Sequence, residues 1–246
     1  RSYFMSAQVK PVDVILRALL MGLLHGPNTD DTPRFFSNHL AADFAPLPEE
    51  AIAVWKEHHL QPPVCNVREM IQHRAAYLLA KPPDRTTGLV KKGDSQKVQF
   101  SDGGQLFDWI ITSPPYYGMD SYPTGQWLRN WFLGGPTCPE TKTNSQISQK
   151  SPKVYVYDLA KVWKRITPFC NPGARLIVRI GNVPGIAAPP AVDLFQTSLN
   201  RVGSGWKIEN SVSVRRNTTT QKSVSAFGPP ALWPENEMEV FARLTS

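Results

Sequence analysis

The feature that most constrains this chain is an apolar run that ends in a stiff, polar corner. Leu106 to Ile111 reads Leu-Phe-Asp-Trp-Ile-Ile, and Thr-Ser-Pro-Pro-Tyr-Tyr-Gly follows at residues 112–118. Short apolar runs bounded by turn residues are typical of buried strands, and consecutive prolines fix the backbone and remove amide donors. In open α/β sheets, ligands bind outside the carboxyl ends of the strands. The corner therefore predicts a site, with a merely rigid turn as the alternative.

The pattern around this corner predicts an α/β fold. Strands are expected at 88–92, 107–112, 174–180, 206–215 and 238–244, and helices at 124–133, 155–168 and 190–201. Alternating strands and helices indicate a mostly parallel sheet. Only a loop separates the last two strands, so they should form an antiparallel hairpin at the sheet edge.

The first part of the chain has a different texture. Helices are expected at 11–24, at 48–59 and after a cap at Asn66, with long loops between them. The first of these is apolar on all sides and should be buried. We therefore expect a helical lobe over residues 1–85, which could recognise a target or contact a partner, and a catalytic part over residues 86–246.

Composition limits the partners and the compartment. The chain has 246 residues, a formal net charge of +7 and a pI near 9.4. This charge favours nucleic acid as a partner, and the alternative is a mildly basic surface without a partner. Three widely spaced cysteines without a Cys-x-x-Cys pair argue against disulfides and zinc. The apolar stretch at 12–24 is too short to span a bilayer. A cytoplasmic protein without metal or membrane is expected.

The corner suits the methylation of an exocyclic amine. Such an amine is a poor nucleophile because its lone pair is delocalised into the ring. Ser113 could offer a side-chain acceptor and Pro114 a free carbonyl to the two N–H bonds, while Pro115 stiffens the turn. Tyr116 could stack on the base, a contact of about 1–3 kcal/mol. The base would first have to leave the duplex.

The segment at 107–122, FDWIITSPPYYGMDSY, resembles motif IV of the DNA amino-methyltransferases, which use S-adenosylmethionine to methylate cytosine N4 or adenine N6. Ser in the first position is more typical of the cytosine-N4 branch. The resemblance implies a Rossmann-like class I methyltransferase sheet and extends over residues 86–246. Residues 89–95 resemble the strand and acidic turn beside the cofactor, so it implies cofactor contacts at Asp94, Ser95, Thr112 and Ser113.

One departure from the family is large. The Phe-x-Gly-x-Gly cofactor loop, which follows the first strand of the family, has no counterpart in this chain. Either the missing strands lie upstream of Arg1, or a second polypeptide supplies them, as a native start at Met5 would favour. A partner would also cover the sheet edge beside residues 88–92, because proteins avoid unpaired edges.

A loop at 217–225, with its flanks, carries the predicted contacts to double-stranded DNA. Arg215, Arg216 and Lys222 could hold phosphates, and Gln221 could read a base edge, although a solvated hairpin tip explains them equally well. The leading hypothesis is a subunit or fragment of a bacterial or phage DNA modification methyltransferase, acting near the nucleoid. The alternatives are an RNA or protein-glutamine methyltransferase, and a DNA-binding subunit without catalysis.

Overall fold

The computed structural model describes residues 10–24, 48–57, 59, 66–81, 88–99, 104, 106–119, 127–138, 147–203, 205–214 and 236–245. The chain divides into two compact units. The first comprises residues 1–89, 121–143 and 218–231, and the second comprises residues 90–120, 144–217 and 232–246. Each unit is described by itself.

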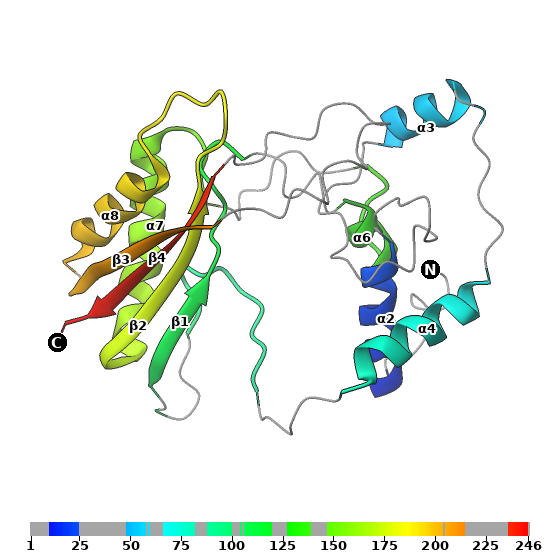
Figure 1. The fold of residues 1–246 in the computed structure, drawn as a ribbon, viewed down its shortest axis with the longest axis horizontal. Helices are drawn as coiled ribbons and strands as arrows, with labels where there is room; N and C mark the ends of the chain where they lie inside the picture. Colours follow the sequence, from blue (N-terminus) through cyan, green and yellow to red (C-terminus); the bar gives the residue numbers. More distant parts are fainter. Residues whose placement is uncertain are drawn as a thin grey trace. The chain divides into compact units, whose positions relative to one another are not determined.

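The second unit is built on a mixed sheet of four strands. The strands are β1 (Phe107–Thr112), β2 (Cys170–Gly181), β3 (Trp206–Val214) and β4 (Glu237–Leu244), in the order β1-β2-β4-β3 (Figure 1). β1 runs parallel to β2, while β4 is antiparallel to both β2 and β3. The predicted antiparallel pairing of the last two strands is confirmed, and β3 forms one edge.

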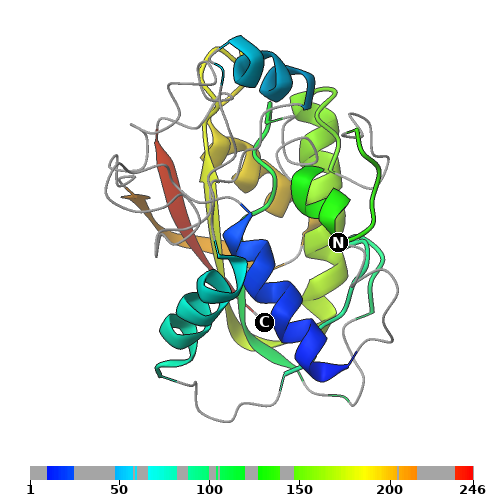
Figure 2. The ribbon, with the colours of Figure 1, turned by 90° about the vertical axis from the view of Figure 1, so that its right-hand side faces the viewer.

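Two helices cover one face of this sheet. α7 (Pro152–Ile166) and α8 (Ala191–Val202) both lie on that side, as the two views show (Figures 1 and 2). Alternate residues of the strands point into the shared core, among them Leu176 and Val178 of β2 and Val240 of β4, all fully buried. Trp163 and Phe195 meet edge to face with their ring centroids 5.6 Å apart. The period-two pattern of the strands thus produces a one-sided core.

Local signals explain where these helices begin and end. The Ser151 hydroxyl accepts a hydrogen bond from the Val154 amide at 3.3 Å, and Pro152 occupies the first helical position. α7 therefore begins three residues before the expected start at 155 and passes into a short 3-10 turn, η1 (Thr167–Phe169). α8 ends at Gly203, whose φ of +56° is the left-handed conformation favoured at a helix C-terminus.

The strand expected at 88–92 does not form. These residues have no regular structure, and the Val90 side chain is 97% exposed. A strand needs a hydrogen-bonded neighbour, and no described strand lies beside this segment. Instead the segment continues into a turn at Asp94 and is held against α7 by the Arg165 Nε donor, 2.7 Å from the carbonyl oxygen of Val98.

The first unit contains short helices: α2 (Pro11–Leu23), α3 (Pro48–Glu57), α4 (Val67–Leu79) and α6 (Trp127–Phe132). Asn66 caps α4 as predicted, since its Oδ1 accepts hydrogen bonds from the next amides in the helix. α2 and α4 lie side by side (Figures 1 and 2). The expectation that α2 is buried on all sides is wrong, because contact on one side leaves Val12, Val14 and Ile15 exposed.

Candidate functional site

The predicted corner lies at the carboxyl end of β1. β1 ends at Thr112, which pairs with Val178, so β2 runs three residues further and brings Gly181 near the corner. Ser113 and Pro115 are exposed, whereas Pro114 and Tyr116 are buried. The turn closes at Gly118, where φ is +85° and a Cβ atom would come within 2.7 Å of the Ile186 side chain. Only glycine fits this conformation without displacing that neighbour.

Two hydrogen bonds tie the corner to α7 and the segment before it. The buried Tyr155 hydroxyl donates to the Pro115 carbonyl at 2.7 Å. The Gly118 amide donates to Gln149 Oε1 at 2.8 Å. The Pro114 carbonyl accepts no hydrogen bond from the described part of the chain, so it is the carbonyl of the corner that a ligand could use.

Tyr116 lies in the core below the corner. Its side chain is 7% exposed, and its hydroxyl donates to Glu237 Oε1 at the start of β4, 3.1 Å away. Burial raises the pKa of the Tyr116 phenol, a hydrogen bond from Ser113 lowers it, and the charge and hydrogen bond of Glu237 raise it, with a net upward shift. The ring face is covered in this structure, so base stacking on Tyr116 stays a prediction.

A cavity of about 160 Å³ opens beside the corner. Tyr117 forms one wall. The end of β2, the loop after it and the start of α8 form the rest, with Asn182, Val183, Ile186, Pro189 and Leu194 among the lining residues. This place, outside the carboxyl ends of two parallel strands, is where α/β sheets bind ligands. The Asn182 side chain accepts a hydrogen bond from the Ala191 amide at 2.7 Å and so ties the loop to α8.

The sequence interpretation missed Tyr117 and the loop after β2. Tyr117 follows directly after the residue that was assigned the aromatic role, and its ring meets Tyr155 at 5.5 Å. The available signals were the Tyr-Tyr pair itself and the Gly-Asn pair that ends the second strand. Neither pattern tells which side chain faces the cavity, because that depends on how the turn packs.

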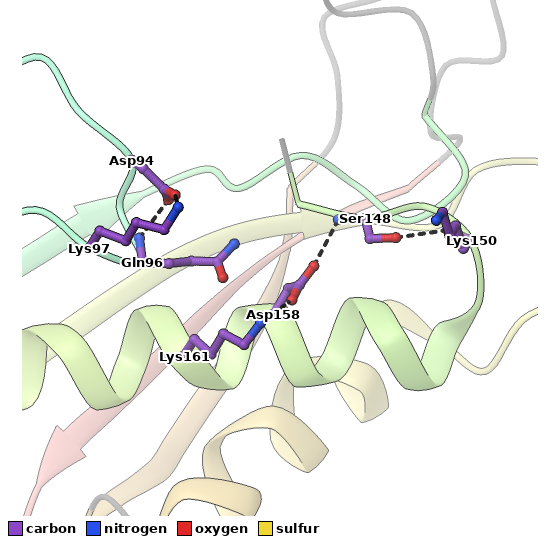
Figure 3. Close-up of polar contacts among 7 residues, drawn as sticks. All are labelled: Asp94, Gln96, Lys97, Ser148, Lys150, Asp158 and Lys161. Carbon is purple, nitrogen blue, oxygen red and sulfur yellow. Dashed lines mark hydrogen bonds and ion pairs between the residues drawn. The ribbon is translucent and has the colours of Figure 1, made fainter. Parts of the chain in front are cut away.

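The predicted cofactor residues fall into two places. Asp94 accepts a hydrogen bond from the Gln96 amide at 2.9 Å and pairs with Lys97 at 3.3 Å (Figure 3). Its pKa is lowered, chiefly by the Gln96 amide. Figure 3 shows this turn facing the side of α7 that carries Asp158 and Lys161. Ser95 is exposed on the same turn.

Thr112 and Ser113 stand at the carboxyl end of β1, apart from that turn. No hydrogen bond or ion pair joins either of them to Asp94 or Ser95 in the part of the chain that the structure describes. β1 is followed by the proline corner and not by a glycine-rich turn. No contact given for the described residues therefore joins the four predicted cofactor residues into one site.

The remaining predictions concern contacts to DNA, metal ions and membranes. Arg215, Arg216, Gln221 and Lys222 lie outside the described residues. Among the residues that are described, no group of His, Cys, Asp and Glu is arranged to hold a metal ion. None of the described helices combines the length and hydrophobicity needed to cross a membrane.

No protein-family model and no curated protein matches this chain. A candidate DNA modification methylase from Thermus thermophilus is 18% identical over 63% of this chain and 52% of its own, with a TM-score of 0.37. This chain thus spans about half the length of that protein. An S-adenosylmethionine-dependent methyltransferase from Methanosarcina mazei is 13% identical over 70% of this chain and 76% of its own, with a TM-score of 0.36.

A third solved structure has a different activity in its name. The cyclase SpnF is 13% identical over 99% of this chain and 94% of its own, with a TM-score of 0.35. Because one fold supports many reactions and these TM-scores are low, the likenesses assign no reaction to this chain.

Proposed function

We propose that this chain carries the target-amine side of an S-adenosylmethionine-dependent DNA methyltransferase, with cytosine N4 favoured over adenine N6. The observation that carries the proposal is the corner at residues 113–116, which follows a strand and lies beside a cavity. Ser113 is exposed there, and the Pro114 carbonyl accepts no hydrogen bond from the described residues. A corner that served packing alone would have no need to present acceptors at the ligand-binding edge of a parallel strand pair.

The two acceptors suit an amine with two N–H bonds. Ser113 Oγ and the Pro114 carbonyl would accept one hydrogen bond each, which draws the lone pair back onto the nitrogen and turns it towards the methyl donor. Tyr155 holds the Pro115 carbonyl at 2.7 Å, and this contact fixes the direction of the neighbouring Pro114 carbonyl. Catalysis of this kind comes from positioning and fixed dipoles.

The cavity size supports a single-ring base. A cavity of about 150 Å³ holds one benzene molecule, and the cavity beside Tyr117 measures about 160 Å³. A flipped cytosine has one six-membered ring, whereas adenine has two fused rings. With Tyr117 on one wall and prolines on another, the lining suits the face of an aromatic ring. Serine in the first position of the corner favours the same base by the family resemblance.

The free side of β1 supports a further set of strands. Among the described strands β1 pairs only with β2, and its outward residues Phe107, Trp109 and Ile111 are 37%, 51% and 74% exposed. Long apolar edge strands invite pairing, and parallel strands are normally covered on both faces. We place the strands that carry the cofactor loop on this side, supplied by sequence upstream of Arg1 or by a partner chain. S-adenosylmethionine held there would supply the methyl group.

The proposal is tested by expressing the native locus, with its neighbouring genes, in a host that lacks DNA methylation. Mass spectrometry of the hydrolysed genomic DNA should detect N4-methyldeoxycytidine, and Ser113→Ala and Pro115→Ala should abolish it. Tyr157→Phe, on the exposed side of α7, is the control and should leave it unchanged. N6-methyldeoxyadenosine would move the target to adenine. Methyl groups found only in RNA or in protein glutamine, or found nowhere, would overturn the DNA assignment.

A further inference from the structure

We infer that Asn182 is a specificity-determining residue for this reaction, whose side-chain amide donates a hydrogen bond to the ring nitrogen beside the target amine, which is N3 in a cytosine. The inference rests on the proposed function and deepens it. It names the group inside the cavity that distinguishes a suitable base from an unsuitable one.

Asn182 is one of two polar side chains in the wall of the cavity. Among the residues that line the cavity, the others are glycine, alanine, proline and larger aliphatic residues, and the second polar side chain is Tyr117. Sites for small ligands are commonly apolar, with a few polar groups that fix the orientation of the ligand. A tyrosine hydroxyl can either donate or accept. Asn182 therefore decides which kind of hydrogen bond the wall offers.

The orientation of the Asn182 amide follows from its hydrogen-bond partner. The Ala191 backbone N–H donates to Asn182 Oδ1 at 2.7 Å. Only the oxygen of a side-chain amide accepts, and a rotation by 180° would set the Nδ2 donor against the Ala191 donor. Nδ2 therefore keeps two hydrogens to donate, and neither goes to a described residue in the hydrogen bonds of this structure. The wall of the cavity thus carries a donor and not an acceptor.

Two elements hold this donor in place. Asn182 directly follows β2, whose last residue, Gly181, pairs with Glu237 of β4. Ala191 is the first residue of α8, so the hydrogen bond also ties Asn182 to the start of that helix. The plainer role of Asn182 is to satisfy this amide, because the first amides of a helix have no acceptor within it. The two roles are compatible, since one uses Oδ1 and the other uses Nδ2.

The donor matches the edge of a base whose amine can be methylated. In cytosine and adenine the ring nitrogen beside the exocyclic amine is an acceptor, whereas in guanine the corresponding nitrogen carries a hydrogen. The corner would accept from the amine, and Asn182 would donate to the ring nitrogen. Enzymes that take a base out of the duplex recognise it along this Watson–Crick edge. A flipped guanine would set one donor against another and be rejected.

The experiment compares Asn182→Asp with the control Asn210→Asp in the complete enzyme expressed from the native locus. Aspartate keeps an oxygen that accepts from Ala191, but its carboxylate has no hydrogen to donate. Asn210 makes the same kind of contact, since its Oδ1 accepts from the Ser211 amide at 2.8 Å, but it lies on β3 and does not line the cavity. The control therefore reproduces both the retained hydrogen bond and the added charge.

Methyl transfer is measured as kcat/KM on DNA duplexes that carry either cytosine or 3-deazacytosine at the target position. In 3-deazacytosine a C–H group replaces N3. The preference for cytosine should be about 10- to 100-fold smaller in Asn182→Asp than in wild type, because the hydrogen bond to N3 is lost and the carboxylate repels its lone pair. Asn210→Asp should keep the wild-type preference. The different reactivities of the two bases cancel in this double comparison.

The outcomes separate the inference from a structural role and from the proposed function. Asn182→Asp should melt within about 3 °C of wild type, because the Ala191 amide keeps its acceptor. An unchanged preference for cytosine in Asn182→Asp would overturn the inference even if the variant were slower, since damage to the cavity would slow transfer to both bases alike. If the target proves to be adenine, 1-deazaadenine replaces 3-deazacytosine. If wild type methylates no base in DNA, the proposed function itself fails.

Discussion

At the scale of single residues, the proposed role of the corner depends on its two proline carbonyls being used differently: the Pro115 carbonyl accepts a hydrogen bond, and the Pro114 carbonyl accepts none from the described residues. Tyr155, rooted in the core by its position on α7, donates to the Pro115 carbonyl. Since each proline restricts its own φ and the conformation of the residue before it, fixing one carbonyl also fixes its neighbour. The Pro114 carbonyl can then be aimed at a ligand without being mobile.

Tyr155→Phe tests this arrangement. The variant removes one hydrogen bond to an exposed residue, so the free energy of unfolding should fall by about 1 kcal/mol, measured by urea denaturation. Methyl transfer should fall further than stability accounts for, because the Pro114 acceptor loses its alignment. Tyr157→Phe on the same helix removes only an exposed hydroxyl and should change neither quantity. Equal effects of the two variants would show that the contact with Pro115 does not organise the corner.

The residue types of the corner are what made it predictable. Serine followed by two prolines at the end of an apolar run has few structural uses, so Ser113 to Pro115 could be singled out from the chain alone. The sequence could not predict that Tyr116 lies in the core and Tyr117 lines the cavity, because this depends on which of the two rings packs into the core. Glu237 was equally hidden, since only the antiparallel pairing of β4 brings it to the corner.

At the scale of elements, α7 and α8 form the layer that supports the site. Their contact contains a buried polar pair: Trp163 Nε1 donates to Ser198 Oγ at 2.8 Å, and Ser198 donates in turn to the Phe195 carbonyl at 2.6 Å. Both side chains are almost completely buried. A buried donor that loses its partner retains the full cost of having left water. This pair should therefore lock the two helices in one register.

Ser198→Ala should lower the free energy of unfolding by about 1–3 kcal/mol, because the Trp163 N–H is left without an acceptor. Thr197→Ala is the matched control, since Thr197 makes the same kind of bond to a carbonyl four residues back but faces solvent. It should change stability by less than about 0.5 kcal/mol. In a Trp163→Phe background the effect of Ser198→Ala should shrink, and an undiminished effect would contradict the pairing.

Elements with their own periodicity were found from sequence. The strand at 107–112 and the start of the strand at 206 match the structure. The other sheet strands and the helices α6, α7 and α8 differ from the prediction by a few residues at their ends. The strand at 88–92 failed for a physical reason. Leu89 and Val90 have strand-forming side chains, but a strand exists only where a neighbour accepts its hydrogen bonds. The sequence pattern indicates strand propensity, but it does not indicate whether a neighbouring strand is present to pair with.

At the scale of the whole molecule, the sheet of the second unit is asymmetric. One face carries the core beneath α7 and α8, while β1 presents large apolar side chains away from it. The other strands carry ion pairs on that outward face, such as Arg179 with Glu239 and Arg243 with Glu209. Apolar surface is thus concentrated at the β1 edge, the side on which the cofactor strands are proposed.

This asymmetry predicts that the 246-residue chain by itself binds S-adenosylmethionine weakly or not at all. Isothermal titration calorimetry should detect no binding at S-adenosylmethionine concentrations up to about 1 mM, which is the weakest KM usual for enzymes. The physical reason is that the described residues include Thr112 and Ser113 but no glycine turn after a strand. The assembly from the native locus should bind in the micromolar range. Micromolar binding by this chain alone would contradict the prediction, since the strands that hold the cofactor would then have to come from its own residues.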